Sequence, residues 1–188
     1  MKRILLLLCI VIIALNTNAQ DSNYKLFEFY EGYIINKDGN RERGYIQYID
    51  ESDRYEKVIF KKEKKGKKER FKPKDIQGYK VADKVYHAVQ YEDIPFKNNK
   101  FLVLEKEGCL NQYYYRKLNE GAWDTEVILK NNDKAVTTQK FILGFANKMA
   151  EMVEDDKALA SKIKNKEKGY SLMHIEAIVD EYNSNCKK

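Results

Sequence analysis

The chain has 188 residues, of which 35 are Lys or Arg and 29 are Asp or Glu, so its formal net charge is +6 with both histidines neutral. Only two prolines and nine glycines occur, which excludes collagen-like and proline-rich disordered proteins. The length fits one domain and is too short for a large α/β enzyme. The 14 tyrosines and 8 phenylalanines supply large side chains for a core.

The first 19 residues have the composition of a signal peptide. Two cations precede an unbroken apolar run of 12 residues, 4–15, which is shorter than the roughly 20 residues that a membrane-spanning helix needs. The small residues Thr17 and Ala19 predict cleavage between Ala19 and Gln20. We therefore expect an exported mature chain, periplasmic or extracellular, with no transmembrane segment and a net charge of 33 − 29 = +4.

Three cysteines occur, and two of them lie in the expected mature chain. Cys9 lies inside the apolar run and follows Leu8 instead of a small residue, which argues against a lipoprotein signal. An oxidising compartment permits a disulfide between Cys109 and Cys186, which would stabilise the fold by roughly 3–4.5 kcal/mol on the chain-entropy model. Two unpaired thiols are the alternative, because Cys186 lies near the chain end, where ordering is poor.

Residues 24–49 predict strands joined in a hairpin. Asp38–Gly39 separates two runs rich in aromatic and β-branched residues, 33–35 and 45–49. Asp-Gly in this position predicts a two-residue type I′ turn, in which both residues have positive φ. The triplet Gly-Tyr-Ile, which occurs at 32–34 and again at 44–46, then forms the two arms of one hairpin and is not a solenoid repeat.

Further short strands are expected as far as residue 137. Turn signals recur between apolar runs, and no alternation of strands with long helices appears. The pattern predicts about eight or nine short antiparallel strands curled into a barrel or sandwich. After the first hairpin, strands are expected at 57–60, 76–81, 84–91, 101–105, 110–116, 126–129 and 135–137, with a loop at Asn98–Asn99.

The apolar period changes at Thr138, after which apolar residues recur every three or four positions, as in a helix. We expect three short helices: one with Thr138 as its N-cap, a second over about 155–166 that ends at Gly169, and a third after Ser171. They should pack on one face or end of the sheet and cover an edge. The expected fold is α+β in one domain, with an N-terminal antiparallel β region (20–137) and a C-terminal helical region (138–188).

Four features together resemble a family pattern. They are the Gly-x-Ile hairpin at 32–46, the segment Pro73–Tyr79 with the pattern Pro-x-Asp-Ile-x-Gly-Tyr, the Phe-Leu strand, Gly turn and Tyr-rich strand at 101–115, and the helical tail ending near Cys186. This set is similar to that of small uncharacterised secreted proteins of Bacteroidota-type bacteria. The resemblance implies export and a strand-then-helix fold, and it implies no catalytic residue.

No residues have the spacing of a familiar catalytic or metal site. His87 and His174 are the only histidines, and neither belongs to a cluster with the spacing of zinc ligands. Nucleophile elbows, phosphate-binding glycine loops and dinucleotide-binding motifs are absent from the sequence. We therefore expect isolated structural or surface histidines, no metal, no cofactor and no catalytic residue.

The stretch Lys61–Lys74 has the most biased composition, with nine Lys or Arg and two Glu among 14 residues. One interpretation is a solvated hairpin tip whose charges keep a sheet edge from pairing. The other is a loop that binds lipid phosphates or surface polysaccharides. Nucleic acid fits the charge but not the expected compartment. The candidate anion-binding residues are Lys61, Lys62, Lys64, Lys65, Lys67, Lys68 and Arg70.

The run Tyr113–Tyr115, with Trp123 nearby, is a candidate ligand-binding surface. Alternate residues of a strand share a face, so Tyr113 and Tyr115 could together form a platform on which a sugar ring stacks. The alternative is ordinary sheet packing, since Tyr favours half-buried pleated surfaces.

Three functions follow from these features. The leading hypothesis is an exported, non-catalytic envelope protein that acts by binding or surface contact, with envelope proteins, anionic lipid or polysaccharide as partners. The second is a glycan-binding or small-ligand-binding domain that uses the barrel mouth or the tyrosine face. The third is a hydrolase of unrecognised type, which would require a deep polar pocket with convergent acids or histidines.

Overall fold

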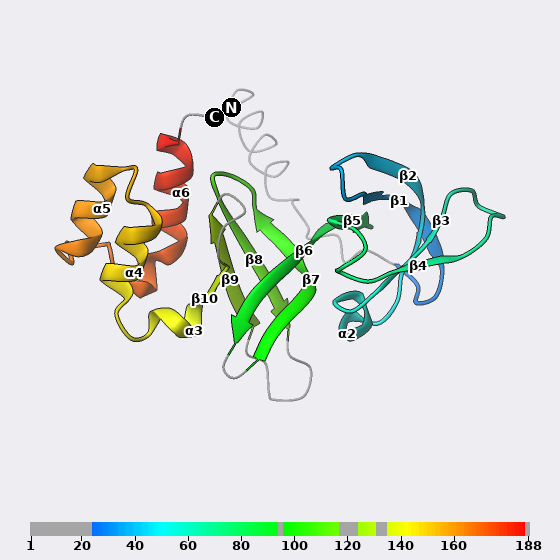
Figure 1. Ribbon diagram of the computed structural model, residues 1–188, viewed down its shortest axis with the longest axis horizontal. Helices are drawn as coiled ribbons and strands as arrows, with labels where there is room; N and C mark the ends of the chain where they lie inside the picture. The colour runs from blue at the N-terminus through cyan, green and yellow to red at the C-terminus, as the bar shows by residue number, and fades with distance from the viewer. Residues whose placement is uncertain (1–23, 94–95, 117–123, 131–134, 187–188) are drawn as a thin grey trace, which may run out of the picture.

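The computed structural model describes residues 24–93, 96–116, 124–130 and 135–186. Within these ranges, an antiparallel sheet of ten strands is followed by a group of helices, which confirms the α+β class (Figure 1). The spatial order of the strands is β10-β9-β8-β7-β6-β5-β1-β2-β3-β4. The bounds of the first five are β1 Phe29–Ile35, β2 Arg41–Gln47, β3 Val58–Lys61, β4 Glu69–Phe71 and β5 Gly78–Val81. The others are β6 Lys84–Asp93, β7 Phe96–Lys106, β8 Leu110–Arg116, β9 Asp124–Lys130 and β10 Val136–Thr137.

The long strand β6 joins two halves of the sheet. Its first residues, 84–87, pair with β5, and its residues from Tyr86 onward pair with β7. We call β1–β5 the first half and β6–β10 the second half. A single parallel bridge, Tyr91 to Ala135, brings the chain before β10 to β6. The sheet nevertheless remains open, with β4 and β10 at its two ends. The expected closure into a barrel is therefore wrong, because β6 extends the sheet sideways from one half to the other.

The β1–β2 hairpin confirms that the two Gly-Tyr-Ile triplets lie on the two arms of one hairpin. Gly32 lies directly opposite Gly44 in the register, and a Cβ added to Gly32 would fall 2.1 Å from the Lys80 carbonyl oxygen, so that close approach requires glycine. The predicted two-residue type I′ turn is wrong. Gly39 has φ +84° and Asp38 is not in the positive-φ region. Five residues, 36–40, connect the strands. Two hydrogen bonds close this connection: Asn36 N–H donates to the Asn40 carbonyl, and Gly39 N–H donates to the Asn36 carbonyl.

Two local predictions in the β region require correction. Asn98 and Asn99, expected to form a loop, lie inside β7, where they pair with Tyr91 and Gln90 of β6. Extended cross-strand pairing thus overrides the turn preference of Asn. A four-residue helix, α2 (Glu51–Arg54), lies between β2 and β3. Its length is a single turn, which leaves no apolar period to detect in the sequence.

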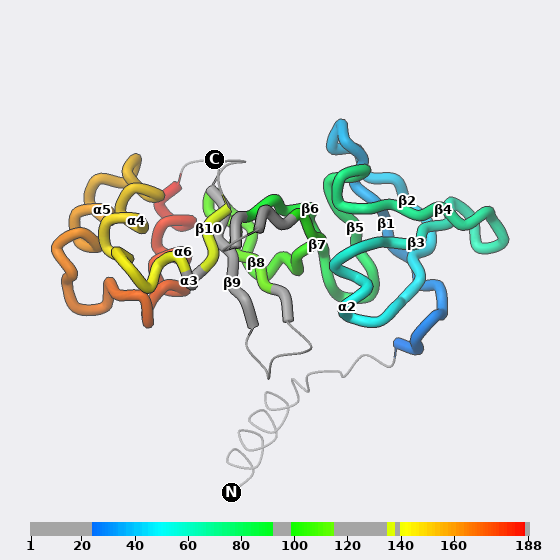
Figure 2. The backbone as a smooth tube through the Cα atoms, turned by 60° about the horizontal axis from the view of Figure 1, so that its bottom comes forward, coloured from blue at the N-terminus to red at the C-terminus, as the bar shows by residue number. Residues whose placement is uncertain are grey.

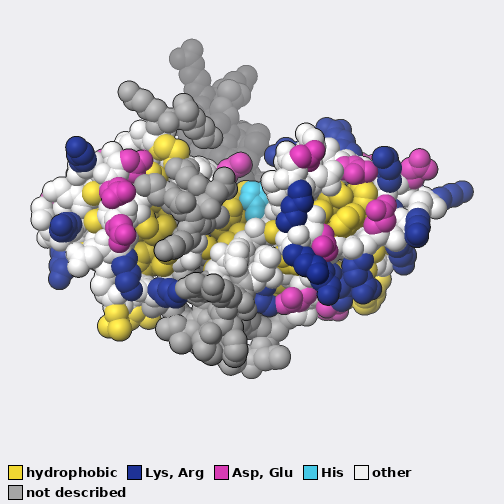
Figure 3. Space-filling view, in the orientation of Figure 1, with side chains coloured by type: hydrophobic (Ala, Val, Ile, Leu, Met, Phe, Trp, Pro, Cys, Tyr) yellow, Lys and Arg dark blue, Asp and Glu magenta, His cyan; other side chains and the backbone are white. Residues whose placement is uncertain are grey.

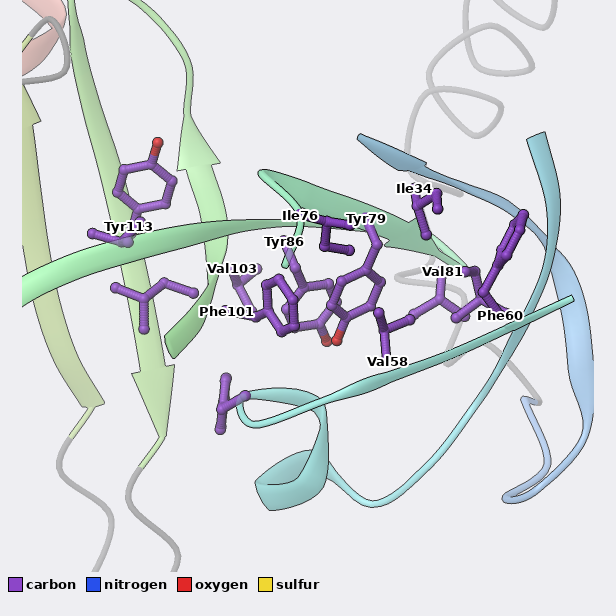
Figure 4. Close-up of a cluster of buried hydrophobic side chains, with 14 of the residues drawn as sticks. Ile34, Val58, Phe60, Ile76, Tyr79, Val81, Tyr86, Phe101, Val103 and Tyr113 are labelled. Carbon is purple, nitrogen blue, oxygen red and sulfur yellow. The ribbon is translucent and has the colours of Figure 1, made fainter. Parts of the chain in front are cut away.

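The sheet encloses an aromatic core that spans both halves. The rings of Tyr79 and Tyr86 stack with centroids 4.6 Å apart, and Phe101 packs edge-on against Tyr79 at 5.0 Å (Figure 4). All three are at most 1% exposed. The buried Tyr79 hydroxyl donates to the Arg54 carbonyl at 2.7 Å, so this core also fixes the position of α2.

The helices follow β10 directly. Their bounds are α3 Thr138–Phe141, α4 Phe145–Met152, α5 Lys157–Lys164, the 3₁₀ turn η1 Leu172–His174 and α6 Ile175–Asn185. The helix expected from Thr138 is broken into α3 and α4, because Gly144 has φ +85°. The expected second helix is confirmed as α5, where the Asp156 carboxylate accepts from Leu159 N–H. The third corresponds to η1 and α6.

The helices pack at the β8–β10 end of the sheet, as expected, around a separate core (Figure 1). Phe141, Val153 and Ile163 of this core are fully buried, together with Leu110 from β8. The helical region therefore has an apolar core of its own, to which the sheet contributes Leu110 of β8 and the partly buried Val136 of β10.

Three side-chain ties hold α6 against the β7–β8 turn, and we call them the clasp. Cys109 and Cys186 form a disulfide. The Asn183 side chain accepts from Leu110 N–H and donates to the Leu110 carbonyl, each at 2.9 Å. Lys106 Nζ lies 2.8 Å from the Asp180 carboxylate. Of the two alternatives left open for the cysteines, the structure has the disulfide.

Candidate functional site

The basic stretch forms a hairpin tip at one end of the molecule. Val58 and Phe60 of β3 face the core at 1% exposure. The side chain of Lys61, the last residue of β3, lies on the opposite face and is half-buried. A tight turn follows, in which Gly66 N–H donates to the Glu63 carbonyl at 2.8 Å. The chain returns as β4, which is an outer strand of the sheet. We call residues 61–70 the cationic loop (Figures 1 and 2).

The side chains of the cationic loop are almost entirely in solvent. Lys61 is half-buried, whereas Lys62, Lys64, Lys65, Lys67, Lys68 and Arg70 are exposed. Lys62 Nζ lies 3.4 Å from the Glu42 carboxylate and still has a side chain 74% exposed. Within the described ranges, that is the one ion pair formed by these seven cations. The structure therefore presents a concentrated positive charge that the protein itself leaves largely uncompensated.

The base of the loop is fixed against an aromatic ring. The ammonium groups of Lys61 and Lys68 lie 4.3 and 5.5 Å from the centroid of the Phe29 ring on β1. Lys61 Nζ also donates to the Lys64 carbonyl at 3.4 Å. Cation–π contacts of this kind contribute about 0.5–1 kcal/mol at exposed sites. These contacts orient the start and the end of the loop, while the lysines between them remain in solvent. Figure 3 shows Lys and Arg side chains gathered over this end of the molecule.

His87 of β6 pairs with Tyr113 of β8 within the second half of the sheet. His87 Nδ1 lies 3.1 Å from the Tyr113 hydroxyl. Burial lowers the pKa of the imidazole, with Glu107 acting in the opposite direction, and burial raises the pKa of Tyr113 to about 12. Both groups are thus uncharged at neutral pH. Among the described residues, His, Cys, Asp and Glu form no group of three that could hold a metal ion. The pair links β6 to β8 across the intervening strand β7.

The tyrosine platform requires correction at Tyr113. Its side chain is 2% exposed, because the curl of the second half turns that face of β8 inward. It therefore packs, as the alternative interpretation held, and is closed to a stacking sugar. The side chain of Tyr115 and all of Trp123 lie outside the described residues, and so does the expected cleavage site between Ala19 and Gln20.

Sequence reasoning missed Arg54, which ends α2 and is 8% exposed. Its guanidinium carbon lies 4.4 Å from the centroid of the Tyr48 ring, and its Nε has no hydrogen-bond partner. No salt bridge to Arg54 occurs in the described part of the chain. An aromatic face therefore replaces a carboxylate as the partner of this buried cation. The polar segment around Arg54 gives no signal of this burial.

Sequence reasoning also missed an exposed apolar pair beside the cationic loop. Leu26 and Phe27 precede β1 and are 48% and 63% exposed. They look like strand or core residues in the sequence, because aromatic and aliphatic residues alternate densely around them.

Comparison with known proteins found no match to this chain among family models, curated proteins or solved structures. None of the helices in the described ranges combines the length and apolar character needed to cross a membrane.

Proposed function

We propose that this chain is an exported, non-catalytic envelope protein that binds anionic envelope material through the cationic loop. The observation that carries this proposal is the set of exposed cations on one hairpin tip, of which Lys62 alone has a carboxylate neighbour in the described structure. The predicted signal peptide supports an envelope location, where lipid phosphates and acidic polysaccharides are the abundant polyanions.

The expected binding strength follows from the number of exposed cations. Each Lys or Arg near an anionic surface contributes about 1 kcal/mol, and the contribution falls away within a Debye length, about 8 Å at physiological salt. Lys64, Lys65, Lys67 and Lys68 are all exposed in this short loop, so a flat or extended polyanion can meet several of them at once. The binding should therefore be strong at low salt and weaken steeply as salt is added.

The test replaces Lys64, Lys65, Lys67 and Lys68 by Gln and measures cosedimentation with vesicles that contain phosphatidylglycerol. We expect the affinity to fall about 700-fold at low salt, since four contributions of about 1 kcal/mol are lost and every 1.4 kcal/mol is tenfold in affinity. A matched control replaces four exposed lysines of the helical region, which are Lys157, Lys164, Lys166 and Lys168. The control has the same net charge as the loop variant and should bind as the wild type does. Equal losses in both variants, or none in the loop variant, would contradict the proposal.

A further inference from the structure

Leu26 and Phe27 are held in an exposed position by the backbone. Phe27 has φ +67°, a left-handed conformation that is rare for a bulky residue and costs energy. Its N–H donates to the Tyr48 carbonyl at 2.6 Å, and its carbonyl accepts from Gln47 Nε2 at 2.7 Å. These two bonds fix the turn with the Phe27 side chain 63% exposed. The two hydrogen bonds therefore hold the backbone in a strained conformation, in which this apolar pair projects into solvent and contributes little to the core.

The turn that carries the pair is tied to a group of aromatic rings with polar ends, because Lys25 N–H donates to the Tyr30 hydroxyl at 2.8 Å. Tyr24 lies edge-on to Tyr30 with ring centroids 4.8 Å apart, and the Tyr48 ring lies 5.5 Å from Tyr24. All three tyrosines are half-buried. Amphipathic rings of this kind suit the boundary between an apolar layer and water.

The projection and the cationic loop lie at the same end of the molecule. Phe29, two residues after Phe27, has the ring over which the ammonium groups of Lys61 and Lys68 lie, at 4.3 and 5.5 Å. The two views of the backbone both place the start of the described chain and the β3–β4 loop at the same end of the molecule (Figures 1 and 2). The apolar pair and the cluster of lysines therefore lie at the same end of the molecule.

We propose that the anionic partner of the cationic loop is a lipid bilayer, into which Leu26 and Phe27 insert. This inference rests on the proposed function and specifies its partner. Lysines would meet the lipid phosphates, tyrosines would lie at headgroup depth, and the apolar pair would enter the acyl layer. An acidic polysaccharide complements the lysines equally well, but it offers no apolar phase for Leu26. The exposed apolar pair thus distinguishes the two partners.

The first experiment compares two kinds of ligand for the variant L26S/F27S. We expect its affinity for phosphatidylglycerol vesicles to fall at least tenfold, and its affinity for a soluble acidic polysaccharide, polygalacturonate, to stay at the wild-type value. The matched control is I142S/L143S, which removes an apolar pair that is 68% and 82% exposed in the helical region. The control should bind both ligands as the wild type does. Far-ultraviolet circular dichroism checks that each variant is folded.

The outcomes separate this inference from the proposed function. Wild-type vesicle affinity in L26S/F27S, combined with a loss in the four-lysine variant, would overturn the inference and leave the proposed function standing. Retained binding by the four-lysine variant would overturn the proposed function itself. A loss of vesicle binding in I142S/L143S but not in L26S/F27S would place the apolar contact at the helical end, which also overturns the inference.

Insertion depth gives an independent measurement. In F27W, lipids with brominated acyl chains should quench tryptophan emission by more than they quench it in the wild type, which has Trp123 as its single tryptophan. Equal quenching in the two proteins would contradict insertion, even if both bind vesicles.

Discussion

The sheet and the helical region are stabilised in different ways. The sheet contains an aromatic core in which Tyr79, Tyr86 and Phe101 are in ring contact, and these residues come from three different strands. The helical region has a smaller and mainly aliphatic core, with Val153 and Ile163 at its centre. It is joined to the sheet by the clasp of disulfide, amide and ion pair.

This difference has a physical reason. The strands pair with neighbours over their whole length, so each large ring is held by partners from several elements. The longest helix in the described ranges, α6, has only 11 residues, and helices of that length are marginal in water without tertiary contacts. Covalent and polar ties to the sheet therefore provide stability that these short helices lack on their own. Three substitutions test whether the sheet and the helical region are stabilised in these different ways.

The largest effect is expected in the aromatic core. Phe101→Ala removes a fully buried ring that packs edge-on against Tyr79. We expect the free energy of unfolding to fall by about 3–5 kcal/mol, since the cavity would be bordered by rings that cannot collapse into it. Urea denaturation measures the change. Glu105→Ala, at an exposed position of the same strand, is the control and should change stability by less than about 0.5 kcal/mol. A loss below about 1 kcal/mol in Phe101→Ala would show that this core is not what holds the sheet.

The next effect concerns the disulfide of the clasp. Replacing Cys109 and Cys186 together by Ser should lower stability by roughly 2–4 kcal/mol, because a link between residues 77 positions apart is lost. Hydrogen exchange should accelerate first in α5 and α6 and remain slow in β5 and β6. Reductant should reproduce this pattern in the wild type and have no effect on the double variant. Uniform acceleration across the sheet and the helices would mean that the two regions do not differ in the way described.

The smallest effect tests the amide of the clasp. A Cβ at Gly108 would fall 2.3 Å from the Asn183 side chain, which bonds both backbone groups of Leu110. Gly108→Ala should therefore displace that amide and cost about 1–3 kcal/mol. In an Asn183→Ala background, the same change should cost less than about 0.5 kcal/mol, since the clash is gone. A double-mutant cycle measures this, and additive costs would show that Gly108 acts independently of the clasp.

Much of the fold could be predicted from local patterns. The two Gly-Tyr-Ile triplets predicted the two arms of the β1–β2 hairpin, and the change of period at Thr138 predicted where strands give way to helices. The turn at Asp38–Gly39 and the strand position of Asn98 were wrong, because loop length and partner strands decided them. The open sheet also escaped prediction, since it depends on β6 pairing on both edges.

Only the positive charge of the candidate site could be predicted from the sequence. Lysines at a hairpin tip are visible in composition alone, and the structure places them in solvent as that pattern suggests. The exposure of Phe27 depends on a bond to Tyr48, which is 21 positions away, and no local pattern encodes it. The burial of Tyr113 likewise depends on the direction in which the second half of the sheet curls.

The double role of β6 determines where this protein can be cut. Tyr86 and His87 pair with β5 on one edge and with β7 on the other. Any fragment that ends near these residues would retain one neighbour and lose the other, leaving a row of amide and carbonyl groups without partners. Each half of the sheet thus depends on β6, and neither half can be transferred to another protein without this strand.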